Sequence, residues 1–140
     1  MMHFLDTDTM THAHLGHRKV ASRIEQVGEQ NVATTIVTAI EIIRGRHEYI
    51  LKAADGAQLL RAQQLLNASE EMLMDIQIFR VDAQAAAEFD RLRQIKRLKK
   101  TGRADLLIGC ITLAHRATLV TRNYDHFRQI PGLKIENWVD

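Results

Sequence analysis

Acidic residues stand at several points of this 140-residue chain where a carboxylate could take part in chemistry. Asp6 follows an apolar run directly, and Glu41 lies among isoleucines. Asp105 comes three residues after Gly102, and Asp125 lies in the segment that follows another apolar run. Each acid also has an ordinary explanation when taken singly. Asp6 fits a turn or helix cap, and Glu41 fits an exposed position paired with Arg44. Asp105 fits a favourable contact with a helix dipole, and Asp125 fits a solvated loop.

The same acids make a stronger case together. Carboxylates that converge at one end of a sheet repel each other, and some take up protons unless a cation neutralises them. Oxygen ligands with few nitrogen or sulfur atoms select Mg²⁺ or Mn²⁺ over Zn²⁺. Such a metal activates water and stabilises charge on attacking and leaving oxygens, so the pattern indicates phosphodiester hydrolysis.

Strands and helices alternate in the predicted order of elements that would position these acids. Short apolar runs predict strands over 2–5, 32–34, 76–81, 118–121 and 134–136. Helical spacing predicts helices over 18–28, over 36–43 with a bend or end at Gly45, over 83–98 with Asp82 as the cap, and after Gly102. It also predicts one or more helices between 55 and 74. This alternation predicts a mostly parallel sheet of four to five strands with helices on both faces, whose ligands bind beyond the carboxyl ends of the strands.

Composition favours one globular domain covering residues 1–140. Hydrophobic residues make up 46% of the chain and charged residues 26%, enough apolar material for a real core. The single cysteine excludes a disulfide scaffold and fits a reducing compartment. No apolar stretch is long enough to cross a membrane, and the first residues do not resemble an export signal. We therefore expect a cytoplasmic protein.

Positive charge is concentrated between Arg91 and Arg103, although the net charge is only +2. Most of this segment is interpreted as the solvated face of an amphipathic helix whose buried side carries Leu92 and Leu98. Lys99, Lys100 and Arg103 lead directly into Asp105. There they are placed to contact a nucleic-acid backbone without reading its sequence.

Four segments in order resemble the PIN domain, specifically the VapC-type toxins of bacterial toxin–antitoxin pairs. The opening segment is Phe-Leu-Asp-Thr-Asp at 4–8, and the second is Thr-Ala-Ile-Glu-Ile-Ile-Arg-Gly at 38–45. The third is Ala-Asp-Leu-Leu-Ile at 104–108. The ending comprises Leu-Val-Thr-Arg-Asn at 119–123, then Phe127, Ile-Pro-Gly-Leu at 130–133 and Glu-Asn-Trp at 136–138.

This resemblance implies a three-layer α/β/α fold and a single-strand-specific, Mg²⁺-dependent endoribonuclease acting on tRNA or rRNA loops. Mn²⁺ is the alternative metal. It also implies a homodimer silenced by a cognate antitoxin. Asp6 and Asp105 would then hold the metal directly, and Glu41 would orient or deprotonate the nucleophile. The family's fourth acid corresponds either to Asn123 or to His126, and Asp125 is the neighbouring substitute.

The residues that flank these acids have supporting roles in the same interpretation. Asp8 adds a metal contact or an acceptor beside the metal ligands. The hydroxyls of Thr7 and Thr121 either contact phosphate or serve as structural caps, and Asn123 binds through its amide oxygen or a bridging water.

Two other functions are compatible with the sequence. Asp6-x-Asp8 after a strand is also typical of haloacid-dehalogenase-type phosphatases, in which Asp6 would be the nucleophile and Asp8 the acid/base. That chemistry needs a downstream acid pair near a glycine, which this chain lacks. The third hypothesis is a catalytically degraded PIN-like binding module, incomplete at the fourth acid.

Overall fold

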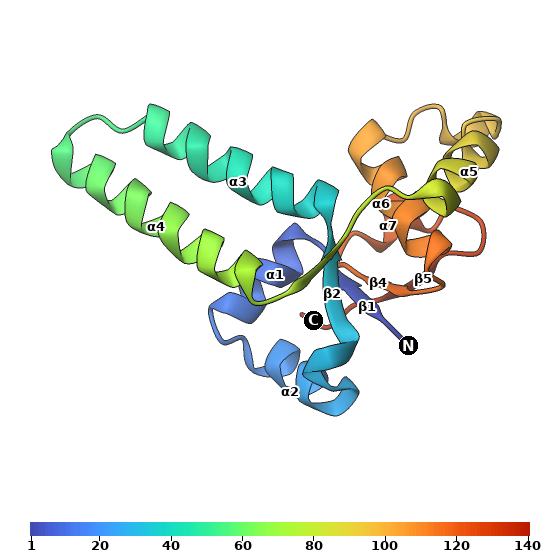
Figure 1. The fold of residues 1–140 in the computed structure, drawn as a ribbon, viewed down its shortest axis with the longest axis horizontal. Coiled ribbons are helices and arrows are strands. Elements are labelled where there is room, and N and C mark those ends of the chain that lie inside the picture. The colour runs from blue at the N-terminus through green and yellow to red at the C-terminus, as the bar shows by residue number, and fades with distance from the viewer.

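A parallel five-stranded sheet lies at the centre of the computed structural model, which describes residues 1–140 (Figure 1). The spatial order is β3-β2-β1-β4-β5, and every neighbouring pair is parallel. The strands are β1 (His3–Leu5), β2 (Val32–Thr35), β3 (Gln77–Phe79), β4 (Thr118–Val120) and β5 (Lys134–Glu136). The predicted fold class and all five predicted strands are confirmed.

Helices cover both faces of the sheet. They are α1 (Thr7–His14), α2 (Arg18–Val27), α3 (Ile36–Leu51), α4 (Gly56–Met74), α5 (Ala83–Leu92), α6 (Arg103–Ala114) and α7 (Tyr124–Phe127), with 3₁₀ turns at Glu29–Asn31 and Lys96–Leu98. Successive strand residues point to opposite faces. Phe4 accordingly belongs to the core beneath α5 and α6, whereas Leu5 belongs to the core beneath α1, α2 and α3.

Side-chain caps fix where several helices begin. Asp6 accepts a hydrogen bond from the Thr9 N–H, and Thr35 accepts one from the Thr38 N–H, so α1 and α3 start immediately after their strands. Asp82 accepts from the Ala85 N–H at 2.8 Å, which confirms its predicted role as a cap. These caps set the positions of the residues that follow the strand ends.

Two predicted helix boundaries are wrong. α3 continues through Gly45 to Leu51, because its packing on α4, which includes a 2.9 Å bond from Arg46 Nε to the Ser69 hydroxyl, outweighs the glycine penalty of about 1 kcal/mol. α5 ends at Leu92 instead of reaching residue 98, since the N–H groups of Gln94 and Ile95 bond to carbonyls three residues back and the chain tightens into a turn. Leu92 and Leu98 are nevertheless both buried.

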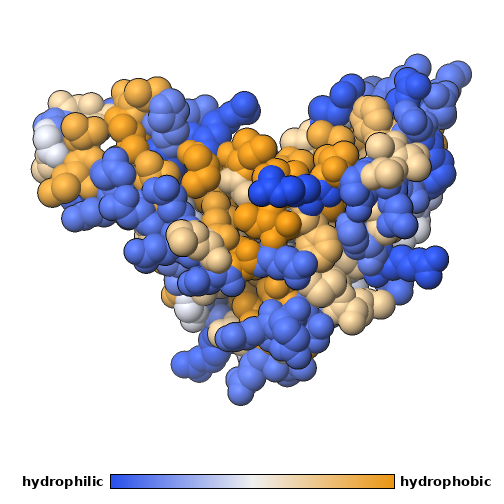
Figure 2. Space-filling model, viewed as in Figure 1, coloured by the Kyte–Doolittle hydropathy of each residue, from blue (hydrophilic) through white to orange (hydrophobic).

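α3 and α4 form a hairpin that projects from the body opposite the lobe of α5, α6 and α7 (Figure 1). Apolar side chains are visible in the notch between them (Figure 2). One hollow of about 480 Å³ on α3 includes Ile40, whose side chain is 54% exposed. None of the helices combines the length and apolar character that crossing a lipid bilayer requires.

Candidate active site

The strand order reverses direction between β1 and β4, and this point positions the candidate site. From β1 the chain proceeds to β2 on one side, whereas β4 lies on the other side of β1. Asp6 directly follows β1 and Thr121 directly follows β4. Ligands of open parallel sheets bind where the connections diverge in this way, so these two residues mark the expected location.

Asp6 is held rigidly at this edge and its side chain is only 7% exposed. Its Oδ1 accepts from the Thr9 N–H at 2.9 Å, and its Oδ2 accepts from the Thr121 hydroxyl at 2.6 Å. The Thr121 hydroxyl oxygen in turn accepts from the Asn123 N–H at 3.0 Å. The carboxylate therefore has a fixed orientation before any ligand arrives. Thr121 thus serves as a donor to this acid, a role different from the phosphate contact and the structural cap considered for it.

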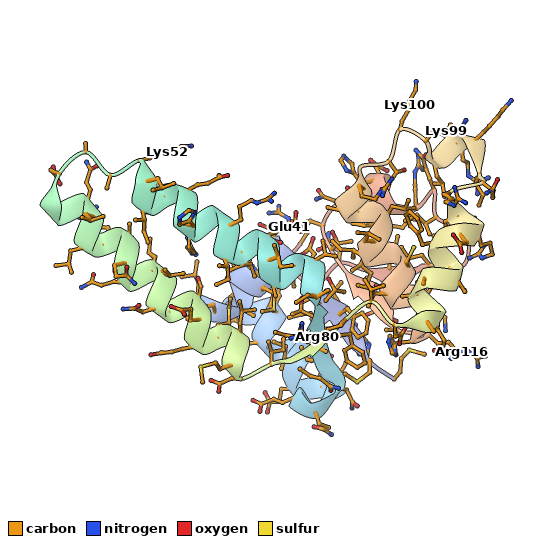
Figure 3. The ribbon with its side chains drawn as sticks, turned by 45° about the horizontal axis from the view of Figure 1, so that its top comes forward. Glu41, Lys52, Arg80, Lys99, Lys100 and Arg116 are labelled. Carbon is orange, nitrogen blue, oxygen red and sulfur yellow. The ribbon has the colours of Figure 1, made fainter.

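Glu41 approaches the same region from α3, on the side facing the notch (Figure 3). Partial burial raises the pKa of its carboxyl group, and the negative charges of Asp105 and Asp6 raise it further. Arg44 opposes this shift without cancelling it. The negative charges of Asp105 and Asp6, which are far from Glu41 in the sequence, therefore both act on its carboxyl group, and we call this the shared negative field of the three acids. Their convergence on one metal ion stays a prediction.

Asp105 lies in the first turn of α6, where its carboxylate faces a histidine side chain. The Oδ2 atom of Asp105 is 3.5 Å from Nδ1 of His126, which comes from α7. His126 is the residue just before Phe127, one of the two positions at which the family resemblance places a fourth acid. An imidazole thus occupies the position beside Asp105.

The donor chemistry of this region fits a hard divalent cation. Its acids offer oxygen ligands. The raised pKa of Glu41 reflects burial first and, after it, the negative charges of Asp105 and Asp6, which a cation would relieve. No three or more His, Cys, Asp or Glu side chains lie close enough together to bind one ion as a complete set. Mg²⁺ usually keeps several water ligands and binds through only one or two carboxylates, so the wider spacing is compatible with that ion.

Several other predicted site residues lie away from the three acids. The Asp125 side chain is 86% exposed and pairs with Arg128 at 3.5 Å. Asp8 faces His12 and Arg122, at 3.6 and 3.7 Å, instead of the acids.

Two further candidates have structural contacts through the backbone. The Thr7 carbonyl accepts from the Thr11 hydroxyl. The Asn123 N–H donates to Thr121, and the Asn123 side chain lines a polar hollow shared with Asp8.

The predicted nucleic-acid contacts separate into two kinds. Arg103 lies over the ring of Phe89, with its guanidinium carbon 5.0 Å from the ring centroid, so it packs on α5. Lys99 and Lys100 extend from the tip of the lobe into solvent (Figure 3). These lysines are the members of the predicted set that are available for a polyanion.

The Glu41→Gln variant is expected to be more thermostable than the parent at neutral pH. Because the pKa of Glu41 is raised on folding, its ionisation destabilises the protein as pH rises through that pKa. We expect the melting temperature at pH 7.5, with chelator present, to rise by about 2 °C. The difference should vanish near pH 4, where the carboxyl is protonated.

Scanning calorimetry of both proteins at these two pH values tests this expectation. Glu48→Gln, an exposed change on the same helix, is the control and should leave the melting temperature unchanged at both. A melting temperature for Glu41→Gln at or below that of the parent at pH 7.5 would contradict the shared negative field.

Comparison with known proteins agrees with this geometry. The PIN domain family model matches residues 4–133. Ribonuclease VapC2 of Rickettsia felis is 51% identical over 37 residues, a match that spans 26% of this chain and only 28% of that relative.

Two solved structures cover nearly the whole chain. VapBC2 from Rickettsia felis, bound to a DNA fragment from its promoter, matches with a TM-score of 0.75 and 26% identity, covering 99% of each chain. A toxin–antitoxin complex from Klebsiella pneumoniae matches with a TM-score of 0.59 and 25% identity, covering 95% of each chain. Since the family model spans 130 residues of the 140, this chain belongs to the PIN-domain family, and its predicted resemblance to the VapC-type members is confirmed.

Proposed function

We propose that this protein is a divalent-metal-dependent endoribonuclease that acts as the toxin of a toxin–antitoxin pair. The observation that carries the proposal is the shared field of Asp6, Glu41 and Asp105 at the divergence point of a PIN-domain sheet. The name of the Rickettsia felis relative, a ribonuclease, supports the reaction.

The three acids have distinct roles in this proposal. Asp6 and Asp105 hold the metal, Mg²⁺ or Mn²⁺, with Asp6 oriented in advance by Thr9 and Thr121. The bound metal would activate water and stabilise charge on the attacking and leaving oxygens. Glu41, whose pKa is raised toward the working range of a general base, positions the attacking water and accepts its proton.

RNA binding is proposed to rest mainly on charge. Lys99 and Lys100 stand free at the tip of the lobe, across the notch from α3 (Figure 3). They would contact the backbone of a single strand in tRNA or rRNA loops, giving an affinity that falls as salt rises. Arg103 contributes less because its guanidinium lies over Phe89.

The proposed protein partners are a cognate antitoxin and a second copy of the chain, in the cytoplasm. The Klebsiella pneumoniae match is a toxin–antitoxin complex, which supports the antitoxin. The partly exposed apolar side chains along α3, with Ile40 among them, are the kind of surface that a protein partner covers.

Sequencing of RNA 5′ ends after brief expression of the parent and of Glu41→Gln tests the proposal. New ends that require Glu41, reproduced by purified protein with Mg²⁺ or Mn²⁺ and lost with chelator, would support it. If the purified parent cleaves no RNA with either metal, the degraded binding module becomes the better description. The phosphatase alternative needs Asp8 to act as the acid/base beside Asp6. It is not supported, because Asp8 faces Arg122 and His12.

Variants at 125 and 126 test which residue completes the site. We expect Asp125→Asn to keep RNA cleavage within about twofold, because this solvated side chain pairs only with Arg128. His126→Ala should lower cleavage about 10-fold, because it removes the group beside Asp105. Single-turnover cleavage of a labelled single-stranded RNA is the measurement. The reverse order of effects would assign the fourth position to Asp125.

A further inference from the structure

The guanidinium group of Arg122 is paired with the carboxylate of Asp140. Its Nε and Nη2 atoms donate to the two oxygens of Asp140, at 3.2 and 3.1 Å. This is the two-pronged geometry that an arginine uses to bind a phosphate group. A weaker approach of 3.7 Å joins Nη1 to Asp8.

The chain holds Arg122 at the border of the candidate site. It directly follows Thr121, whose hydroxyl donates to Asp6. The next residue, Asn123, returns its N–H to the same hydroxyl oxygen, which makes the turn tight. The Arg122 side chain lines a hollow of about 480 Å³ together with Asp8, Asn123 and Asp140, all of which are polar residues. A nucleic-acid strand crossing Asp6 would present a neighbouring phosphate at this hollow.

Neighbouring hydrogen bonds position Asp140 to pair with Arg122, but this ion pair is weak. The Asn137 side chain donates to Asp140 Oδ2 at 2.8 Å and accepts from the Val139 and Asp140 N–H groups, which folds the segment back toward Arg122. The Arg122 and Asp140 side chains are 44% and 57% exposed. Exposed pairs of this kind are screened by water and salt, so they exchange readily for another anion.

We propose that Arg122 binds a backbone phosphate of the RNA next to the one that is cleaved, and that Asp140 occupies its guanidinium until RNA displaces it. This inference rests on the proposed ribonuclease function and adds a substrate contact to it. Asp140 is then a competitor of the substrate, and Arg122 is a substrate-positioning residue.

The Arg122–Asp140 pair gives two variants whose effects should differ in sign. In the Glu41→Gln background, which prevents cleavage during the measurement, a fluorescent single-stranded RNA oligonucleotide of mixed sequence is titrated by anisotropy. Arg122→Gln should weaken binding about 10-fold. It should also reduce the slope of log affinity against log salt by about 0.7, the value for one phosphate contact on a single strand. Asp140→Asn should tighten binding about threefold, because it frees the arginine.

The double variant and a distant control separate this contact from general electrostatics. In the Arg122→Gln background, Asp140→Asn should have no further effect, since its gain acts through the arginine. Lys52→Gln removes one positive charge at the outer end of α3 and should change affinity less than about twofold (Figure 3). Thermal unfolding of each variant checks that the pair is not needed for folding.

Three results would overturn the inference. Equal weakening by Arg122→Gln and Asp140→Asn would show that the pair only fastens the end of the chain. A loss with Arg122→Gln no larger than that with Lys52→Gln would show an unspecific charge effect. A gain with Asp140→Asn that persists without Arg122 would show simple repulsion of RNA by Asp140. Parent protein that neither binds nor cleaves RNA would instead remove the proposed function itself.

Discussion

The Asp6→Asn variant is expected to lose RNA cleavage by at least about 100-fold while keeping its fold. The substitution removes one negative charge from the acid group but keeps the shape of the side chain. Its remaining oxygen can still cap the Thr9 N–H, and its amide can donate to the Thr121 hydroxyl. Substitutions of groups that merely support a metal ligand already cost 10- to 100-fold, so loss of a direct ligand should cost at least as much.

Single-turnover cleavage of a labelled RNA in Mg²⁺ and in Mn²⁺ measures this loss, and isothermal titration of Mn²⁺ measures the accompanying loss of metal binding. Asp90→Asn is the matched control, because it is the same change at a 74% exposed acid that pairs with Arg93. It should alter cleavage less than about twofold. Retained cleavage in the Asp6 variant, with the unfolding temperature unchanged, would place the reaction elsewhere on the molecule.

The elements that carry the site could be predicted because their signals are local. Each strand is a short apolar run, and Asp82 lies at the boundary where a cap is needed. Alternation of strands and helices then requires a parallel sheet, whose carboxyl ends lie at one edge. This arrangement favoured convergence of acids at that edge, and the resemblance to the PIN domain then singled out Asp6, Glu41 and Asp105. In the structure, the charges of Asp105 and Asp6 both act on Glu41.

Side-chain direction near the site could not be predicted, because it depends on turns with no sequence period. Asp8 lies two residues from Asp6, yet the first turn of α1 carries it toward Arg122. Asp125 and His126 are adjacent on α7, but the histidine faces Asp105 and the aspartate faces solvent. Two adjacent residues on a helix point in directions that differ by about 100°. The sequence does not reveal these directions, so the expectation of a fourth carboxylate favoured Asp125 over His126.

α1 could not be predicted from the sequence for a related reason. The segment 7–14 has Met10 and Ala13 as its main apolar residues and therefore lacks a helical stripe. Its helix begins because Asp6 caps it, and the buried Thr9 and Met10 side chains pack beneath it. The helix-cap explanation of Asp6 is therefore confirmed, whereas its catalytic role stays a prediction.

The Thr121→Val variant is expected to lose both stability and RNA cleavage, through the longest-range contact of the site. The Thr121 hydroxyl is fully buried, donates to Asp6 across 115 residues of sequence and accepts from the Asn123 N–H. Valine keeps the volume but leaves a buried carboxylate oxygen and a backbone N–H without partners. The expected loss in unfolding free energy is about 1–3 kcal/mol, and cleavage should fall about 10- to 100-fold because the acid is no longer oriented.

Thr121→Ser separates the hydroxyl from the side-chain volume. Serine keeps the donor and the acceptor but loses a buried methyl group, so unfolding free energy should fall by about 1 kcal/mol while cleavage stays within about threefold. Urea unfolding of both variants measures the change in stability. Single-turnover cleavage is measured without urea, at a temperature where both variants remain folded. Equal losses of cleavage in the two would mean that packing of the methyl group, and not the bond to Asp6, maintains the site. A large loss confined to valine would identify orientation of Asp6 as the contribution of β4 to the reaction.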